Sequence, residues 1–227
     1  MSLLAVEGLS KSFGGLRAVD GVGFALAAGA IKAIIGPNGA GKTTLFNLIF
    51  GAAVPDAGTV VFDGVRLPPG RPYRKVAAGL ARTFQQIRLF PQMTALENVM
   101  VGAHTRGRAG FLASLLPLPR TRREELFLRD QAAAALDFLG LNALAASQAT
   151  ELAYGEQRAV ELARALASKP KLVLLDEPAA GLNMRETVEL GKLIRRIRDS
   201  GVTVLLVEHD MGLVMGISDE IVVLCQG

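Results

Sequence analysis

A glycine-rich segment that ends in lysine and two threonines is the clearest candidate for chemistry in this sequence. It matches the spacing G-x-x-x-x-G-K-[ST] at every fixed position, which predicts a loop that binds the phosphates of a nucleotide. Its residues are Gly36, Pro37, Asn38, Gly39, Ala40, Gly41, Lys42, Thr43 and Thr44. Glycines let the backbone turn its N–H groups toward phosphate oxygens. We expect Lys42 to reach the β and γ phosphates and the Thr43 hydroxyl to bind Mg2+.

Two consecutive acids follow an apolar run later in the chain. The run begins at Leu172 and leads into Asp176 and Glu177. Four apolar residues predict a buried strand that presents Asp176 at its carboxyl end, where it would hold the metal and its water shell. Glu177 is then placed to act as a general base toward an attacking water. A solvated strand end is the alternative, and the phosphate loop upstream argues against it.

The elements that must position these residues alternate along the chain. Apolar, β-rich stretches occur at 3–7, 19–26, 30–35, 58–62, 80–84, 172–176, 202–207 and 220–225, and helical periodicity is clearest at 42–51, 156–168 and 185–199. This alternation predicts an α/β fold with a mainly parallel central sheet. The early strands are joined by glycine-rich turns, so an antiparallel sheet should lie beside it. A segment without convincing strands predicts a helical insertion at about residues 90–165.

Composition limits the possible classes. The chain has 227 residues, half of them apolar, which suits one compact domain. Its apolar runs are far shorter than the roughly 18 residues of a membrane-spanning helix, and the N-terminus lacks a secretory pattern. We therefore expect a cytosolic protein that meets a membrane only through another protein. One cysteine and two histidines argue against zinc, and Cys225 lies in a strand pattern that predicts a buried thiol.

The positive charge is concentrated in one segment. The formal net charge is +4, yet residues 66–129 alone hold 12 Lys and Arg against three Glu. Nucleic-acid binders often carry such a patch, but an aromatic content of 5% without tryptophan argues against base stacking. A docking surface for a protein partner and a solvated basic face near anionic lipid headgroups both stay open.

Together these motifs resemble the nucleotide-binding subunits of ATP-binding cassette (ABC) transporters, over about residues 3–227. Gln85 resembles the Q-loop glutamine, His209 the switch histidine, and Phe13 the aromatic residue that stacks on adenine. The segment that resembles the signature sequence comprises Leu152, Ala153, Tyr154, Gly155 and Glu156. The segment at the D-loop position comprises Gly181, Leu182 and Asn183.

The resemblance implies a P-loop NTPase fold with a RecA-like mixed-sheet core, an antiparallel β subdomain and an α-helical subdomain. Residues 1–227 would form one nucleotide-binding domain. ATP and Mg2+ would be the bound groups, with Glu177, His209 and Gln85 catalytic. Thr43, Asp176 and Gln85 would be the metal site. Family members usually continue with a short helical tail, so we also expect a missing or shortened C-terminal tail.

Within this superfamily the segments at 82–90, 93–99, 176–183 and 208–219 look like those of the ATPase subunit of branched-chain amino acid importers. That resemblance implies a second ATPase subunit bound head to tail, a transmembrane permease that docks through coupling helices, and indirectly a periplasmic solute-binding protein. No nucleic acid is expected, and the chain would lie on the cytoplasmic face of the inner membrane. Another importer, for amides or urea, and a soluble cassette ATPase acting on nucleic acid are the alternatives. A P-loop GTPase would need an Asn-Lys-x-Asp motif, which the sequence lacks.

The signature segment departs from the family pattern at Ala153 and Tyr154, where most cassettes have Ser and Gly. Losing the Ser hydroxyl removes one hydrogen bond to a charged phosphate, worth about 1.5–3 kcal/mol. We therefore expect a heterodimer with two unequal ATP sites, the weaker one using this signature. Arg88, Leu89 and Phe90 are the candidates for contact with a coupling helix.

Overall fold

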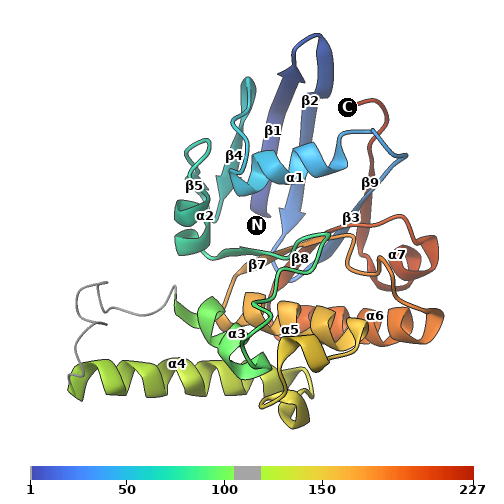
Figure 1. Ribbon diagram of the computed structural model, residues 1–227. Helices are drawn as coiled ribbons and strands as arrows, with labels where there is room; N and C mark the ends of the chain where they lie inside the picture. The colour runs from blue at the N-terminus through green and yellow to red at the C-terminus, as the bar shows by residue number, and fades with distance from the viewer. Residues whose placement is uncertain (1, 105–118) are drawn as a thin grey trace. The chain divides into compact units, whose positions relative to one another are not determined.

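The computed structural model describes residues 2–104 and 119–227, which divide into two compact units. The first unit contains the chain up to Gln85 and the part from Lys171 to Gly227. The second unit contains residues Gln86–Pro170. Figure 1 labels the elements of both. No helix in the described part of the chain is long and apolar enough to cross a membrane.

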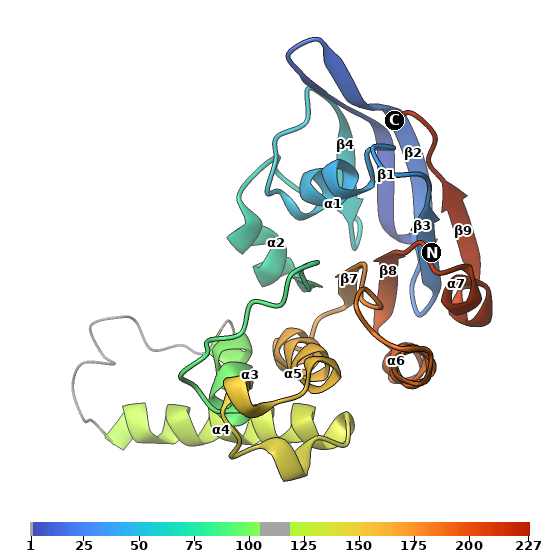
Figure 2. The same ribbon diagram turned by 45° about the vertical axis from the view of Figure 1, so that its right-hand side comes forward.

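A five-stranded parallel sheet is the centre of the first unit. Its strands, in spatial order, are β6 (Leu80–Arg82), β7 (Leu172–Asp176), β8 (Thr203–Val207), β3 (Ile31–Ile35) and β9 (Glu220–Val223). Every residue of β7 and β8 is buried. Such continuous apolar runs are typical of parallel strands covered on both faces. Helices α1 (Lys42–Phe50) and α6 (Met184–Asp199) lie on opposite faces of this sheet (Figures 1 and 2).

A second, antiparallel sheet completes the first unit. Its spatial order is β2 (Leu16–Ala27), β1 (Ser2–Phe13), β4 (Ala57–Phe62) and β5 (Val65–Arg66). Leu4 and Phe62 from this sheet share one apolar core with Phe46 of α1 and with Leu174 and Val207 of the parallel sheet. The two sheets therefore enclose α1, and the predicted α/β class with parallel and antiparallel parts is confirmed.

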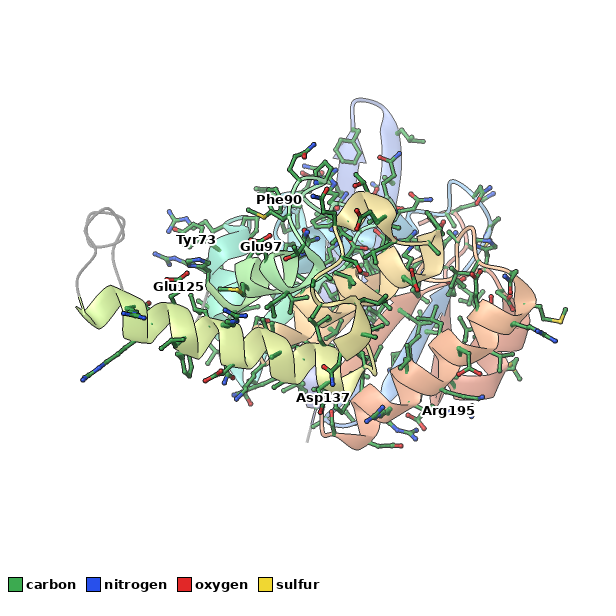
Figure 3. The ribbon with its side chains drawn as sticks, turned by 60° about the horizontal axis from the view of Figure 1, so that its bottom comes forward. Tyr73, Phe90, Glu97, Glu125, Asp137 and Arg195 are labelled. Atoms are coloured by element: carbon green, nitrogen blue, oxygen red, sulfur yellow. The ribbon has the colours of Figure 1, made fainter. Side chains whose placement is uncertain are left out.

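The second unit is helical in its described residues. It contains α3 (Ala95–Ala103), α4 (Pro119–Phe138), α5 (Tyr154–Ala167) and the short turns η2 (Asn142–Leu144) and η3 (Ala149–Glu151). Thr94 and Glu97 form a reciprocal capping box that starts α3. Figure 3 shows Phe90 near the start of this unit, Glu97 on α3, and Glu125 and Asp137 toward opposite ends of α4.

Several boundaries differ from those expected from the sequence. Helices α2 (Pro72–Ala78) and α7 (Met211–Ile217) were not predicted. Each has only seven residues, too few for a clear helical period. The last strand ends at Val223, so Cys225 lies beyond it and is exposed. The prediction of a buried thiol is therefore wrong.

Candidate functional site

The carboxyl ends of three parallel strands place the chemically important residues at one edge of the sheet. Val207 at the end of β8 pairs with Ile34 of β3 on one side and with Asp176 of β7 on the other. The next backbone groups continue this alignment, because the Glu177 N–H donates to the Val207 carbonyl at 3.0 Å. Parallel strands bring the loops that follow them to the same edge. The glycine loop, the two acids and His209 therefore meet there.

The glycine loop after β3 depends on two positions that admit no side chain. Gly36 has φ +156° and Gly41 has φ +94°. A Cβ at Gly36 would lie 2.2 Å from the Leu224 carbonyl oxygen, and one at Gly41 would lie 2.1 Å from the Ala18 carbonyl oxygen. Helix α1 begins directly after Gly41, with no side chain capping its N-terminus. Its first N–H groups and the positive end of its dipole suit an anion.

Lys42 adds a full positive charge to this loop. Its side chain is largely buried, and Nζ donates hydrogen bonds to the carbonyl oxygens of Gly36 at 2.7 Å and Pro37 at 3.0 Å. The ammonium group is thereby held within the curve of the loop. Backbone N–H groups, a helix dipole and a lysine together form a site for polyphosphate.

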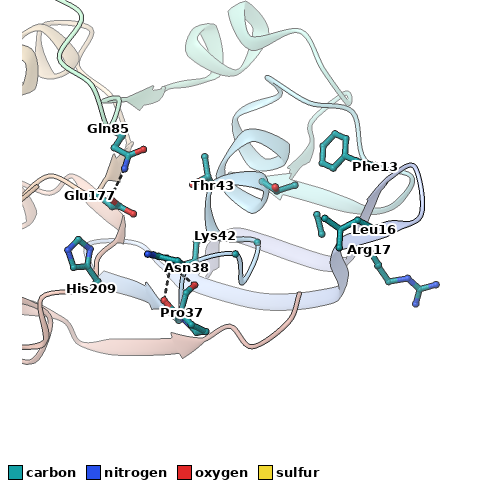
Figure 4. A pocket seen from close by; sticks show the side chains of 15 residues that line it. Phe13, Leu16, Arg17, Pro37, Asn38, Lys42, Thr43, Gln85, Glu177 and His209 are labelled. Atoms are coloured by element: carbon teal, nitrogen blue, oxygen red, sulfur yellow. Dashed lines mark hydrogen bonds between the residues drawn. The ribbon is translucent and has the colours of Figure 1, made fainter.

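An open cavity of ≈860 Å³ lies over the loop. Its size falls within the range of small-molecule and cofactor sites, which is about 300–1,000 Å³. The residues that line it are Phe13, Leu16, Arg17, Ala18, Gly36, Pro37, Asn38, Gly39, Gly41, Lys42, Thr43, Thr44, Gln85, Glu177 and His209 (Figure 4). The cavity thus brings together the glycine loop, the β1–β2 hairpin and three of the predicted catalytic residues.

Glu177 has an unusual backbone conformation and a fixed side chain. Its φ of +47° lies in the left-handed region, which costs a non-glycine residue about 1–2 kcal/mol. The Gln85 amide Nε2 donates to Glu177 Oε2 at 2.8 Å (Figure 4). Gln85 therefore orients the carboxylate that the sequence nominates as general base.

Asp176 is buried and does not line the cavity. Its side chain is 4% exposed and forms an ion pair with Arg82, from Nη2 to Oδ2, at 2.7 Å. Ala40 of the glycine loop is also buried and does not line the cavity.

His209 and the buried Glu208 before it connect two loops. The His209 side chain is 64% exposed and lines the cavity. The fully buried Glu208 carboxylate accepts N–H bonds from Ala179 at 2.7 Å and from His209 at 3.0 Å. Glu208 thereby holds the loop after β8 against the loop that follows Glu177. Nothing in its position relative to the motifs singled it out from the sequence.

The segment at the D-loop position starts a helix instead of lining the cavity. Gly181 adopts φ +81°, and the Leu182 N–H donates to the Ala179 carbonyl at 3.1 Å to close a turn. Asn183 is the N-cap of α6, its Oδ1 accepting from the Arg185 and Glu186 N–H groups at 3.0 and 3.1 Å. Asn183 therefore has a local role as the cap of α6.

The signature segment belongs to the second unit, where it forms the start of α5. Leu152 is buried, Ala153 is the N-cap, and Tyr154 is the first helical residue. The helix therefore begins two residues before the helical periodicity predicted at 156–168. Glu156 Oε2 accepts the Ala153 N–H at 2.9 Å, while Ala153 itself has no oxygen to cap the helix.

Three residues that the sequence motifs did not predict also line the cavity, from the strand after Phe13: Leu16, Arg17 and Ala18. Arg17 pairs with Asp20 at 2.7 Å, and this hydrogen bond raises the pKa of the guanidinium. In the sequence, these residues are marked only by their closeness to the Phe13-Gly-Gly turn. That turn predicts a hairpin but does not predict which face of the hairpin lines a ligand site.

Comparison with known proteins gives consistent matches. Residues 19–180 match the ABC transporter family. The chain is 48% identical, over 99% of its length and 89% of the relative's, to the high-affinity branched-chain amino acid transport ATP-binding protein LivG of Salmonella typhimurium. Its fold resembles the ADP conformation of MJ1267, an ATP-binding cassette of an ABC transporter, with a TM-score of 0.87 and 34% identity, covering 100% of this chain and 89% of that chain. It also resembles the dimeric structure of MJ0796, a bacterial ABC transporter cassette, with a TM-score of 0.82 and 25% identity, covering 99% and 95% of the two chains.

Proposed function

Because the chain belongs to the ABC transporter family of ATPases, we propose that it is the ATP-hydrolysing subunit of an importer of branched-chain amino acids. The observation that carries the ATPase assignment is the cavity in which Lys42, Gln85, Glu177 and His209 meet from four separate segments. The similarity to LivG over nearly the whole chain supports the solute. Solute contacts themselves would lie in other subunits.

The chain's own groups suggest how ATP would be bound. Phe13 is 53% exposed at the rim of the cavity, where its ring offers a surface on which adenine can stack. The loop N–H groups and Lys42 would hold the β and γ phosphates. Adenine would thus lie beside Phe13 and Leu16 at the hairpin, and the phosphates would lie beside Lys42 at the start of α1.

Glu177 and His209 would act at the γ-phosphate end. The Glu177 carboxylate would take a proton from the attacking water, while Gln85 keeps it oriented through the 2.8 Å hydrogen bond. His209, exposed to the cavity, would donate a hydrogen bond to the γ-phosphate. The uncapped α1 N-terminus is already in place to stabilise developing charge, whereas Lys42 would exchange its bonds to the Gly36 and Pro37 carbonyls for phosphate oxygens.

The residues present fit Mg2+. The Thr43 hydroxyl, the Asp176 carboxylate and the Gln85 amide supply hard oxygen donors, and Mg2+ prefers one or two carboxylates together with substrate phosphates and water. The described residues contain no cluster of three or more His, Cys, Asp or Glu that would hold a metal without the nucleotide. When bound, Mg2+ would neutralise charge on the β and γ phosphates.

A second cassette would complete the site. The dimeric structure of MJ0796 supports association of two such chains. The signature residues at the start of α5 would then face the nucleotide held by the partner, with the helix dipole directed at its γ-phosphate. Because Ala153 lacks a hydroxyl, a heterodimer would have one strong and one weak ATP site.

A permease would anchor the chain at the cytoplasmic face of the membrane, with a periplasmic binding protein delivering the solute. Phe90 is 47% exposed in the segment Arg88–Phe90. This segment is fastened by Asn98, which accepts the Phe90 N–H at 2.7 Å and donates to the Phe90 carbonyl at 3.1 Å. A rigid, exposed aromatic beside arginine suits a coupling helix.

The Glu177→Gln variant tests the proposal. The amide has nearly the same size as the carboxylate but cannot accept the proton. We therefore expect nucleotide affinity within about twofold of wild type and hydrolysis reduced by about 10²–10⁴-fold. ATP binding is measured by fluorescence and hydrolysis by phosphate release, with Lys42→Ala as the control that loses binding. Hydrolysis near the wild-type rate would remove Glu177 from the role of base. Stimulation by nucleic acid, and none by the permease with loaded binding protein, would overturn the importer assignment.

A further inference from the structure

Arg82 is a buried cation that contacts Asp176. It is the last residue of β6, which pairs in parallel with β7 so that Arg82 lies opposite Leu174. Its Nη2 is 2.7 Å from Asp176 Oδ2, and both side chains are 4% exposed. The Asp176 carboxylate is thus held from the neighbouring strand through one oxygen, Oδ2, and Oδ1 is not part of this ion pair.

The guanidinium group is anchored independently of Asp176. Nη1 donates to Asn47 Oδ1 of α1 at 2.7 Å. The rings of Phe46, Phe50 and Phe84 surround it, with centroids 5.8, 5.9 and 5.4 Å from the guanidinium carbon. Arginine is suited to such a place because its planar group both stacks on rings and donates in fixed directions. Arg82 therefore stays in position whatever binds to Asp176.

Stability alone is a weak reason for this ion pair. Burying two charges removes both from water, and well-packed apolar residues often serve the interior equally well. The pair does, however, fix a carboxylate in direction. Three residues later, Gln85 fixes Glu177 in the same way at 2.8 Å. One short segment, Arg82–Gln85, therefore orients both acids at the carboxyl end of β7.

We propose that Arg82 is a positioning residue for Asp176, holding Oδ2 so that Oδ1 is kept for the metal that accompanies the nucleotide. The inference rests on the ATPase function proposed above. Orientation and charge predict opposite changes in metal affinity when Arg82 is removed. Removing a cation beside Asp176 would strengthen the attraction for a metal ion if charge alone mattered, whereas loss of orientation weakens metal binding.

The test uses Mn2+, which accepts the same oxygen ligands as Mg2+ and is observed directly by electron paramagnetic resonance. Mn2+ is titrated into the intact chain saturated with a non-hydrolysable ATP analogue. For Arg82→Gln we expect the Mn2+ dissociation constant to rise about 10-fold or more, as is usual when the partner of a metal ligand is lost. Affinity for the analogue in EDTA should stay within about twofold of wild type, because Arg82 does not line the cavity.

Two further variants should weaken Mn2+ binding less than Arg82→Gln does. Arg82→Lys keeps the charge but not the planar fork, so its Mn2+ affinity should lie between wild type and Arg82→Gln. Asn47→Ala removes the anchor of Arg82 without touching Asp176 and should weaken Mn2+ binding by a smaller factor. Lys75→Met is the matched control, since Lys75 is a buried cation of the same unit that bonds to the Ile49 carbonyl instead. Its Mn2+ affinity should equal that of wild type.

Unchanged or tighter Mn2+ binding by Arg82→Gln overturns the proposal. If that variant does not fold, Arg82→Lys and Asn47→Ala provide the test. Wild-type Mn2+ affinity in both of these variants would also overturn the proposal. If the proposed ATPase function is wrong, the titration gives a different result. The wild-type chain would then bind no ATP analogue even in EDTA, and both the function and the role of Arg82 would fall together.

Discussion

Restoring the missing hydroxyl of the signature, by Ala153→Ser, should both stabilise α5 and strengthen a nucleotide contact. Ala153 has φ −62° and ψ 156°, the extended conformation of an N-cap, but no side-chain oxygen. The other half of a capping box is already present, because Glu156 Oε2 accepts the Ala153 N–H at 2.9 Å. A serine hydroxyl would accept the Glu156 N–H and complete the pair.

The magnitudes follow from these contacts. An N-cap Ser in place of Ala stabilises a helix by about 0.5–2 kcal/mol. For a chain of this size, 1 kcal/mol shifts the unfolding midpoint by about 2–4 °C. A hydrogen bond to a charged phosphate adds about 1.5–3 kcal/mol, which is roughly 10- to 150-fold in affinity. In a dimer of two copies each signature contributes once, so ATP-dependent association should tighten by about 100-fold or more.

Two assays separate these effects. Thermal unfolding of each position-153 variant without nucleotide reports the stability of the helix cap. Sedimentation with ATP, with each position-153 change made in the Glu177→Gln background, reports association. Ala153→Gly is the matched control, because glycine is a better N-cap than alanine but supplies no hydroxyl. Its unfolding midpoint should rise slightly, and its association should not tighten.

Two different results would contradict these expected effects of the serine hydroxyl. An unfolding midpoint for Ala153→Ser no higher than wild type would show that the N-cap is not limited by the missing oxygen. Equal association of Ala153→Ser and Ala153→Gly would show that position 153 does not contact the partner's nucleotide. The expected inequality of the two ATP sites would then lose its physical basis.

Two further predictions concern buried charges. Burial lowers the pKa of Lys75 from 10.5 to about 8, so the unfolded chain holds this proton more tightly and stability should rise as the pH increases from 8 to 10.5. The free energy of unfolding of wild type, measured in urea relative to Lys75→Met, should therefore increase by about 1–3 kcal/mol between pH 7 and pH 10, and a constant difference would refute the lowered pKa. Glu208→Gln replaces one acceptor oxygen by an N–H donor and leaves the N–H of Ala179 or His209 unsatisfied, which should lower the free energy of unfolding by about 1–3 kcal/mol and slow single-turnover hydrolysis. Wild-type turnover in that variant would show that the link between the two loops is dispensable.

The elements that carry the motifs were predictable, for a specific reason. Helix α1 and strands β3 and β7 agree with the predicted ranges to within a residue, because a continuous apolar run or a clear helical period lies directly beside a motif. Helix α2 was missed although Pro72 starts it and Gly79 ends it, both of which are ordinary signals. Seven residues are too few for periodicity to support those signals.

The candidate site was predictable as a set of residue types but not as a set of contacts. Phe13, most of the glycine loop, Gln85, Glu177 and His209 line one cavity, while their chemical roles stay predictions. Arg82 and Glu208 could not be found in this way. Their importance comes from partners at distant positions, Asp176 and Ala179, which only the register of the parallel strands brings within reach.

Glu177 shows why those contacts matter for chemistry. It follows Asp176 and precedes Pro178, and its left-handed backbone is unfavourable by about 1–2 kcal/mol for a residue with a Cβ. Three hydrogen bonds offset this cost: its N–H donates to the Val207 carbonyl at 3.0 Å, its carbonyl accepts the Ala180 N–H at 3.1 Å, and its carboxylate accepts from Gln85 at 2.8 Å. Because these partners come from β8, the following turn and the segment after β6, a shift of any one of them moves the base. The position of the proposed proton acceptor is therefore a property of the assembled sheet edge, and we expect residues outside the ATP cavity, through these contacts, to influence the rate of hydrolysis.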